Sequence, residues 1–393
     1  MLKRRIFSYI SKDLEKKMVF IAGPRQCGKT TLARSLSPKE SQEYYNWDFG
    51  ENRKKLLQYI LNPDVLIWIF DEIHKYKSWK NWLKGVYDKF HDQKKILVTG
   101  SAKLDLYSRG GDSLQGRYFL YRLHPVTLSE LVGNEFSEDF SWFQDFSHTQ
   151  KIQEALVELL QRGGFPEPLL ATSQRDTDRW RMNYSSRLIQ EDIRDLENVS
   201  DLGKMELLYE HCPELVGSPL SINNLRTHLE VAHKTLERWI TIFEKTYSVF
   251  RIPPLEGKVI KAIKKEQKLY LWDWSRVTDE GARFENCIAV HLLRWCHFME
   301  DVYGKKAELR YFRTRMGHEV DFVVMLNHKP YAAIEVKLKQ KPIDKNMFYF
   351  LEHFEVPYAF QVSLYGEDNY ITQKEGKTSI HIMPGWRFLQ NLP

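Results

Sequence analysis

Short apolar runs alternate with amphipathic segments in the first third of the chain. The runs MVFIAG (18–23), VLIWIF (65–70) and KKILVTG (94–100) have the length of buried strands, whereas KTTLARSL (29–36) and WLKGVYDKF (82–90) have helical periodicity. Apolar strands interleaved with amphipathic helices are typical of a parallel sheet covered by helices. The pattern therefore predicts an α/β domain over about residues 18–131.

The strand pattern disappears between residues 136 and 201. The segments KIQEALVELLQRGG (151–164) and MNYSSRLIQEDIRDLENV (182–199) are predicted helices, separated by the Gly/Pro break GGFPEPLL. From residue 207 two short helices and the strand YSVFRI (247–252) follow. Ser221 can cap the first of these helices, and the second has apolar residues at helical spacing: Leu236, Trp239, Ile240 and Phe243. This order is typical of a winged helix-turn-helix.

The last part of the chain combines one long helix with strands. The helix is predicted over residues 279–299 (DEGARFENCIAVHLLRWCHFM), and the strands after it include a turn at LNHKP (326–330). Internal repeats and low-complexity segments are absent from the sequence.

Composition fits a globular protein of several domains. The chain has 393 residues, of which 42% are apolar and 28% charged, so about two to four domains are expected and a disordered chain is not. The apolar runs are too short to cross a bilayer, which predicts a cytoplasmic protein without membrane contact. The four cysteines and thirteen histidines show no zinc-binding spacing. The net charge of +6 slightly favours an acidic partner such as nucleic acid.

A glycine-rich turn joins the first apolar run to the first helical segment. It matches GxxxxGK[ST] completely and consists of Gly23, Pro24, Arg25, Gln26, Cys27, Gly28, Lys29, Thr30 and Thr31. In such a loop the backbone N–H groups surround phosphates at the positive end of a helix. Lys29 would bridge the β- and γ-phosphates, and the Thr30 hydroxyl would ligate Mg²⁺. The turn predicts a nucleotide site.

A second motif strengthens this prediction. The apolar strand VLIWIF ends in Asp71 and Glu72, of which Asp71 can hold the metal ion and Glu72 can orient the attacking water. Further along, Thr99 or Ser101 could contact the γ-phosphate, or could simply cap a helix. In the surface segment SRGGDSLQGRY, Arg117 or Arg109 could act as an arginine finger towards a neighbouring subunit, or could be an ordinary solvated arginine.

Four segments in this order, GPRQCGKTTL, FDEIHKYKSW, TGSAKL and LQGRYFLYRLHPVTLSEL, resemble a family of bacterial and archaeal AAA-type ATPases. The segments GGFPEP, EDIRDLE, GARFENCIAVHLL and YFRTRMGHEVDFVV extend the resemblance over nearly the whole chain. The resemblance implies ATP binding and hydrolysis with Mg²⁺ in an oligomer, usually a hexamer-like ring. It also implies that a winged helix and a C-terminal domain of the restriction-endonuclease-like fold follow the ATPase.

Carboxylates near the C-terminus suggest a second site. In HEVDFVVMLNHKPYAAIEVKLKQ (318–340), read as a hairpin, Glu319 and Asp321 lie on one face of the first strand, and Glu335 and Lys337 lie on one face of the second. Asp321 and Glu335 could therefore bind one Mg²⁺, while Lys337 positions or deprotonates a water that attacks a phosphodiester. The alternative is that these charges form the solvent face of an edge strand.

This spacing resembles the core of the PD-(D/E)XK nucleases. The resemblance implies that Glu285, on the preceding helix, completes the site. Val320 stands where the motif has proline, which removes no metal ligand.

Contacts with DNA are predicted at two places. The second helix of the helix-turn-helix would expose Lys234, Thr235 and Arg238, and the segment KVIKAIKKEQK contains a cluster of lysines: Lys258, Lys261, Lys264, Lys265 and Lys268. The alternatives are a winged helix that binds protein and a solvated charge run.

The sequence thus predicts an α/β fold of four parts. These are a P-loop NTPase core of AAA type (1–130), a helical lid (131–200), a winged helix-turn-helix (201–273) and a restriction-endonuclease-like α/β domain (274–393). The first functional hypothesis is an ATP-dependent DNA-processing enzyme with a Mg²⁺-dependent nuclease. The second is a nucleotide-dependent switch or a scaffold that binds DNA or protein, with a catalytically inactive nuclease fold.

Overall fold

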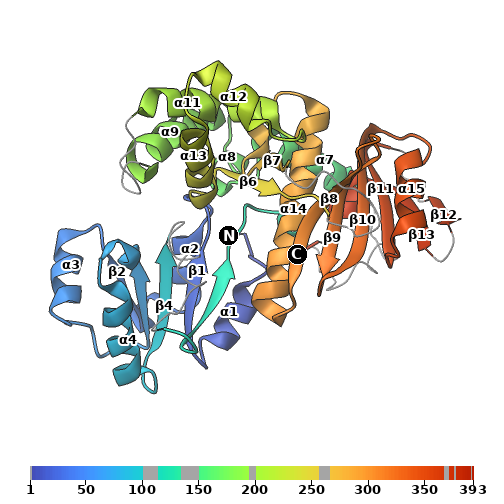
Figure 1. Cartoon of the computed structure of the whole chain (residues 1–393). Helices are drawn as coiled ribbons and strands as arrows, with labels where there is room; N and C mark the ends of the chain where they lie inside the picture. The colour runs from blue at the N-terminus through green and yellow to red at the C-terminus, as the bar shows by residue number, and fades with distance from the viewer. Residues whose placement is uncertain are drawn as a thin grey trace. The chain divides into compact units, whose positions relative to one another are not determined.

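The computed structural model describes residues 2–100, 114–133, 150–193, 201–255, 266–366, 371–375, 378–390 and 392–393. The chain divides into two compact units, Met1–Pro125 and Val126–Pro393. The model is shown in Figure 1.

The first unit is built around a five-stranded parallel sheet with the order β2-β3-β4-β1-β5 (Figure 1). Its strands are β1 (Met18–Ala22), β2 (Gln42–Asn46), β3 (Ile67–Asp71), β4 (Lys95–Gly100) and β5 (Tyr118–Arg122). All residues of β1 and β3 are buried. A parallel strand covered on both faces must be apolar throughout, which is why β1, β3 and β4 were predictable from their apolar runs.

Helices surround this sheet. They are α1 (Phe7–Asp13), α2 (Lys29–Ser35), α3 (Gly50–Leu57) and α4 (Trp79–Phe90), with 3₁₀ turns at Lys39–Ser41 and Ile73–Lys75. The predictions of α2 and α4 are confirmed. The apolar pattern missed β2 and β5, because these edge strands are mostly half-buried and carry polar side chains.

The second unit begins with helices. They are α6 (Leu128–Val132), α7 (Gln150–Arg162), α8 (Pro166–Leu169), α9 (Gln174–Arg187), a π-helical turn (Leu188–Ile193), α11 (Leu202–His211), a 3₁₀ turn (Cys212–Leu215), α12 (Ile222–Leu229) and α13 (His233–Lys245). Ser221 caps α12 by accepting a hydrogen bond from the Asn224 N–H at 3.3 Å, as predicted. The predicted apolar face of α13 is buried. A two-stranded antiparallel sheet follows, formed by β6 (Val249–Ile252) and β7 (Lys268–Leu271).

The last part of this unit contains a six-stranded mixed sheet with the order β12-β13-β11-β10-β9-β8. Its strands are β8 (Ala307–Arg313), β9 (Glu319–Leu326), β10 (Lys329–Lys339), β11 (Tyr358–Tyr365), β12 (Ile371–Glu375) and β13 (Thr378–Pro384). The other elements are a 3₁₀ turn (Trp274–Arg276), α14 (Glu280–Tyr303), α15 (Lys345–His353) and α16 (Gly385–Leu389). Long α14 packs against β8 and β10, and α15 contacts β9.

The predicted hairpin is confirmed. Strands β9 and β10 pair antiparallel with Val323 opposite Ala333 and Phe322 opposite Ile334. The turn between them has positive φ at Asn327 (49°) and His328 (66°), the left-handed backbone that tight hairpin turns require. Because residues alternate between the faces of a strand, this register decides which carboxylates can meet.

The helices that open the second unit pack against its C-terminal part. The His291 Nε2 of α14 accepts a hydrogen bond from the Leu128 N–H at 3.2 Å, and the Trp274 indole N–H donates to the Leu159 carbonyl at 2.9 Å. The four-part division of the chain remains a prediction. Among the described residues, no helix combines the length and the apolar character that a membrane span requires.

Candidate functional site

The glycine-rich turn between β1 and α2 has the backbone that its sequence predicts. Gly23 has a φ of +153°, and a Cβ atom there would lie 2.3 Å from the Leu123 carbonyl oxygen. Gly28 has a φ of +98° and is the N-cap of α2. Both positions require glycine, the first because a neighbouring strand end lies too close and the second because of its left-handed backbone.

Lys29 is the first residue of α2 and is almost completely buried. Its Nζ donates hydrogen bonds to the carbonyls of Gly23 at 3.0 Å and of Pro24 at 2.7 Å. The ammonium group is therefore held inside the loop, close to the backbone that would surround a phosphate.

The remaining residues of the turn have different environments. Arg25, Gln26 and Thr30 are half-buried, whereas Thr31 is exposed. The thiol of Cys27 is buried and lies 3.6 Å from the Leu123 carbonyl. Gln26 has a positive φ of 61°, which a non-glycine residue seldom adopts.

Arg4 supports the turn from outside and was not predicted. Its buried guanidinium donates to the carbonyl of Cys27 at 3.0 Å and also to that of His124. In the sequence, Arg4 belongs only to the basic N-terminal segment MLKRRIF. No pattern connects it with a loop more than twenty residues away.

Asp71, the last residue of β3, accepts three hydroxyl hydrogen bonds. Its Oδ2 accepts from Thr30 Oγ1 at 3.0 Å and from Tyr44 OH at 2.6 Å, and its Oδ1 accepts from Thr99 Oγ1 at 2.6 Å. The structure thus brings together Thr30 and Asp71, the two predicted Mg²⁺ ligands. Burial and the hydrogen bond to Asp71 raise the pKa of Tyr44, so this side chain stays a donor.

Of these partners, Thr99 is one of the two hydroxyls suggested to contact the γ-phosphate, whereas the sequence analysis did not include Tyr44. Tyr44 lies on the unpredicted strand β2 and belongs to no recognised motif. The other suggested hydroxyl, Ser101, lies outside the described residues, as does Arg109.

Glu72 lies directly after Asp71 in a left-handed backbone conformation, with a φ of 57°. Burial raises the pKa of Glu72 to about 7; the charge of Lys29 opposes this rise and the charge of Asp71 adds to it. Its Oε2 lies 3.5 Å from the His74 Nε2. A carboxylate whose pKa is near neutrality is suited to accept a proton from water.

Arg117 forms a two-pronged ion pair within its own unit. Its Nε and Nη2 donate to the two carboxylate oxygens of Asp88, at 2.7 and 3.2 Å. The suggested role as an arginine finger remains a prediction, and it would require Arg117 to leave Asp88.

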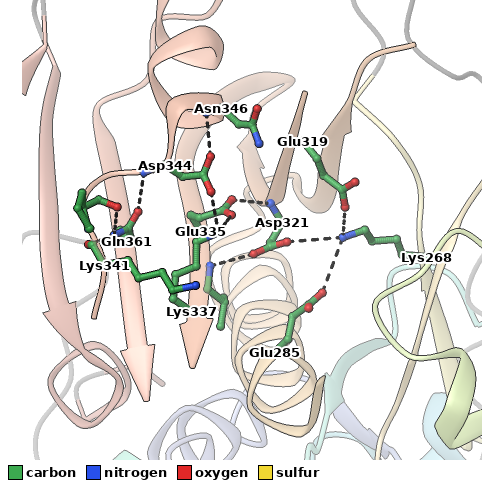
Figure 2. A network of polar contacts seen from close by, with 12 residues as sticks. Lys268, Glu285, Glu319, Asp321, Glu335, Lys337, Lys341, Asp344, Asn346 and Gln361 are labelled. Atoms are coloured by element: carbon green, nitrogen blue, oxygen red, sulfur yellow. Dashed lines mark hydrogen bonds and ion pairs between the residues drawn. The ribbon is translucent and has the colours of Figure 1, made fainter. Parts of the chain in front are cut away.

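The second predicted site lies on the hairpin of β9 and β10 (Figure 2). Asp321 Oδ2 accepts a hydrogen bond from the Val336 N–H at 2.9 Å, and Glu335 Oε2 lies 3.4 Å from the Asp321 backbone nitrogen. Glu335 is buried and Asp321 half-buried. The two carboxylates predicted to share a metal ion are therefore neighbours across the hairpin.

Lys337 lies beside them, as predicted. Its Nζ donates to Glu335 Oε1 at 2.6 Å and to Asp344 Oδ2 at 2.7 Å. Asp344 is the N-cap of α15, where its side chain accepts the Asn346 N–H. The sequence reasoning missed Asp344, although an aspartate before a helical segment is a recognisable cap signal.

A buried glutamine on β11 fixes this arrangement. The side-chain oxygen of Gln361 accepts the Asp344 N–H at 2.9 Å, and its amide nitrogen donates to the Lys341 carbonyl at 2.7 Å. Gln361 thereby holds the loop that carries Asp344 against Lys337, as Figure 2 shows.

Lys268 is the main correction to the sequence analysis. It was grouped with the lysines expected to contact a DNA backbone, yet the residue is only 1% exposed. Its Nζ lies 2.6 Å from Glu319 Oε1, and 3.7 Å from both Glu285 Oε1 and Asp321 Oδ1. Position 268 begins the buried strand β7, and the apolar residues that follow it are the signal that could have identified this lysine as buried.

Glu285 lies at this cluster, as the nuclease resemblance implied. It accepts a hydrogen bond from Tyr270 OH at 2.7 Å and faces Lys268 (Figure 2). Burial and the nearby charge of Asp321 raise the pKa of Glu285 to about 7.

The electrostatics of the cluster favour an added cation. Burial and the charge of Asp321 raise the pKa of Glu335 to about 8, and burial also raises the pKa of Asp321. Burial alone would lower the pKa of Lys268, but the charges of Asp321, Glu285 and Glu319 outweigh it and keep the ammonium protonated. Neighbouring carboxylates that hold protons this tightly would bind a hard cation through their oxygens instead.

The donor sets at both sites fit Mg²⁺. At the first site they are the Thr30 hydroxyl and the Asp71 carboxylate, and at the second the carboxylates of Asp321 and Glu335, all oxygen atoms. Throughout the described part of the chain, no three or more His, Cys, Asp or Glu side chains form a group that could hold a metal ion. A metal ion at either site would therefore rest on two side chains, with backbone, water or substrate oxygens as its other ligands.

The structure describes only some of the residues predicted to contact nucleic acid. On α13, Lys234 and Arg238 are exposed and Thr235 is half-buried. Lys258, Lys261, Lys264 and Lys265 lie outside the described residues.

Three family models match successive parts of the chain. Residues 15–132 match an AAA domain, and residues 153–277 and 280–384 match two domains of unknown function, DUF8612 and DUF4143. The AAA match includes the glycine-rich turn, Asp71 and Glu72. The first unit thus contains an AAA-type ATPase domain of the P-loop class, with the nucleotide binding that this class implies.

The names of the relatives with similar sequences state no activity. Uncharacterized proteins of Mycobacterium bovis and Mycobacterium tuberculosis are each 24% identical over 334 residues, which cover 83% of this chain and 71% of the relative. A Walker-type ATPase of Pyrococcus abyssi is 14% identical, over 71% of this chain and 95% of that one, with a TM-score of 0.42. A RuvB variant of Thermotoga maritima is 19% identical, over 63% of this chain and 87% of that one, with a TM-score of 0.30. Structural likeness this low carries no argument about fold or function.

Proposed function

We propose that this chain is an ATP-hydrolysing, DNA-processing protein in which Glu72 activates the attacking water. The observation that carries the hydrolytic part is the contact of Thr30 with Asp71 beside Lys29, next to a glutamate whose pKa is about 7. Lys29 would bind the β- and γ-phosphates, and the backbone of the turn would hold the phosphate chain. Glu72 would accept the proton of the water that attacks the γ-phosphorus.

Thr30 and Asp71 would hold Mg²⁺ together with the nucleotide. Such an ion neutralises charge that develops on the phosphate oxygens. Thr99 and Tyr44 keep the Asp71 carboxylate oriented through their hydroxyl groups. Both are therefore positioning residues in this proposal.

The test of this function is Glu72→Gln. We expect ATP hydrolysis to fall by about 10²-fold or more, because the amide cannot accept a proton, while nucleotide binding stays within a few-fold of the original. Steady-state phosphate release and titration with a fluorescent ATP analogue measure the two effects. Glu51→Gln, an exposed change on α3, is the matched control and should leave both unchanged.

The pH dependence of ATP hydrolysis is a second test of the role of Glu72. Glu72 can act as a base only when its carboxyl group is deprotonated. With a pKa of about 7, this group becomes protonated as the pH falls through neutrality. Hydrolysis by the unaltered chain should therefore rise with pH through about 7 and then level off. A rate that is already constant between pH 5 and 8, or a Glu72→Gln chain of normal activity, contradicts the role of Glu72 as the base.

A second activity is proposed for the hairpin, namely Mg²⁺-dependent cleavage of DNA phosphodiesters. It is favoured by the convergence of Asp321, Glu335 and Lys337 in a buried sheet, where isolated charges would be costly. Asp321 and Glu335 would bind the ion, which would supply Lewis-acid stabilisation of the phosphate. Lys337, held by Asp344, would position the attacking water or stabilise charge on the phosphate.

Two further parts of the proposal rest mainly on the family resemblance. The exposed Lys234 and Arg238 of α13 would contact the DNA backbone, with Thr235 beside them. Lys261 and Lys265 stay predicted DNA contacts from the sequence. Assembly into a hexamer-like ring would bring Arg117 to the nucleotide of a neighbouring subunit.

The nuclease activity is tested with Lys337→Ala. Purified protein is incubated with Mg²⁺ or Mn²⁺, with and without ATP, on linear, circular, branched and single-stranded DNA. We expect cleavage by the unaltered chain and a loss of about 10²-fold in Lys337→Ala, because a positive charge near the reacting phosphate is removed. Lys339→Ala, at an exposed position of the same strand, is the matched control and should cleave normally.

A chain that leaves every DNA uncut would refute the nuclease and favour the second hypothesis. The protein would then be a nucleotide-dependent switch or a scaffold for DNA or protein. Slow hydrolysis that DNA does not stimulate would agree with this alternative, since a motor that works on DNA should be stimulated by it.

A further inference from the structure

Lys268 is the feature that neither proposed activity uses. It is the first residue of β7, and its backbone is fixed by pairing with Ile252 of β6 and by a bridge to Pro219. The side chain is almost completely buried and crosses to the carboxylates of the nuclease-like region. Burying a lysine is costly unless several partners compensate, so its place needs an explanation.

The partners of Lys268 differ from those of Lys337. Lys268 contacts Glu319, Glu285 and Asp321, whereas Lys337 contacts Glu335 and Asp344. Figure 2 shows the two lysines on either side of the pair Asp321 and Glu335. The Lys268 ammonium also lies 5.4 Å from the centre of the Tyr311 ring, whose face attracts cations.

This geometry divides the acidic cluster into two halves. The half formed by Asp321 and Glu335 borders Lys337 and offers oxygen atoms for a metal ion. In the other half, formed by Glu285, Glu319 and the second oxygen of Asp321, a positive charge is already present within 2.6 to 3.7 Å of each carboxylate. A divalent ion there would meet the ammonium at contact distance, where like charges repel strongly in a low-dielectric interior. Lys337 also lies 2.6 Å from Glu335, but its side chain is 22% exposed and can withdraw toward solvent, whereas the Lys268 side chain is 2% exposed and contacts three carboxylates.

We propose that Lys268 is a built-in cation that fills the second half of the acidic cluster and limits it to one divalent ion. The inference rests on the proposed metal site of Asp321 and Glu335 and deepens it, because it sets the number of ions that this site binds. With Lys268 in place, Glu285, Glu319 and Asp321 form no group that could hold a metal ion. Removing the ammonium should leave their charges uncompensated, so that they can close around a second cation.

The experiment counts bound ions by isothermal titration with Mn²⁺ in the absence of nucleotide. Asp71→Asn is included in every chain so that the ATPase site contributes as little as possible, and circular dichroism verifies folding. We expect one Mn²⁺ for the parent chain and two for Lys268→Met, which keeps the length of the side chain but removes its charge. Lys268→Arg keeps the charge and should bind one ion.

A further double variant separates the possible failures. Asp321→Asn combined with Glu335→Gln should abolish the single ion. If the parent binds no Mn²⁺, or if this double variant binds as the parent does, the proposed metal site itself is wrong. If the parent binds one ion that the double variant loses, and a folded Lys268→Met still binds one with unchanged affinity, only the role of Lys268 is wrong.

The proposal is also tested without altering Lys268. A parent chain that binds two ions at this cluster overturns it directly. Glu319→Gln removes the carboxylate nearest to Lys268 but no ligand of the single ion, so the count should stay at one and the affinity should change less than about threefold. A loss of the ion or a tenfold weaker affinity in Glu319→Gln would make Glu319 a metal ligand and refute the division of the cluster.

Discussion

Lys29→Met is expected to reduce ATP hydrolysis by about 10²–10³-fold, the range seen when one group that stabilises transition-state charge is removed. The Lys29 ammonium is buried in the glycine-rich turn, 2.7 to 3.0 Å from two of its carbonyls. The nucleotide phosphates would attract the charge that now contacts these weaker acceptors. Methionine has a similar length and fits the same space, so the fold of the turn should survive.

The measurements are steady-state phosphate release and the affinity for ATP. Lys29→Met should lower both, whereas Glu72→Gln should lower only the rate, because Lys29 contacts the ground-state nucleotide and Glu72 acts on the water. Lys55→Met, at an exposed position of α3, controls for the loss of one positive charge. Hydrolysis within threefold of normal in Lys29→Met would contradict a P-loop mechanism.

Glu130→Ala is expected to destabilise the second unit by about 3–5 kcal/mol, the usual effect of breaking a buried ion pair from one side. Glu130 of α6 accepts two hydrogen bonds from the Arg294 guanidinium of α14, at 2.5 and 3.0 Å. Both residues are only 4% exposed. Without the carboxylate, the arginine keeps its charge but loses its principal counter-ion, because a guanidinium does not lose its proton in a protein.

Amide hydrogen exchange of α6 and α14 measures this effect locally, and a loss of about 3 kcal/mol corresponds to at least about 10²-fold faster exchange in these helices. Replacing both partners, as Glu130→Met with Arg294→Met, should restore most of the stability because no buried charge remains. Asp178→Ala breaks the partly exposed pair with Arg181 and should cost less than about 1 kcal/mol. A Glu130→Ala chain with unchanged exchange would show that the pair contributes nothing.

Local patterns predicted the parts of the fold that depend on neighbours in sequence. The buried strands β1, β3 and β4, the glycine-rich turn and the hairpin of β9 and β10 follow from apolar runs, from positive φ angles and from turn residues. Strands β2 and β5 were not predicted, because an edge strand need not be apolar. Tyr44 was not predicted for the same reason, because it lies on β2 and its hydroxyl reaches Asp71 only through the pairing of β2 with β3.

By itself the sequence determined which chemical groups lie at the two candidate sites. GxxxxGKT with a distant Asp-Glu pair, and Asp321 with Glu335 and Lys337, are spaced along strands and turns, and the period of a strand decides which side chains share a face. These residues meet as predicted. Only the tertiary structure decided what surrounds them: Arg4 behind the turn, Gln361 behind Asp344, and Lys268 inside the acidic cluster. The physical reason is that burial and the charges near a group depend on which distant segments pack together, and the spacing of residues along the chain does not record which segments these are.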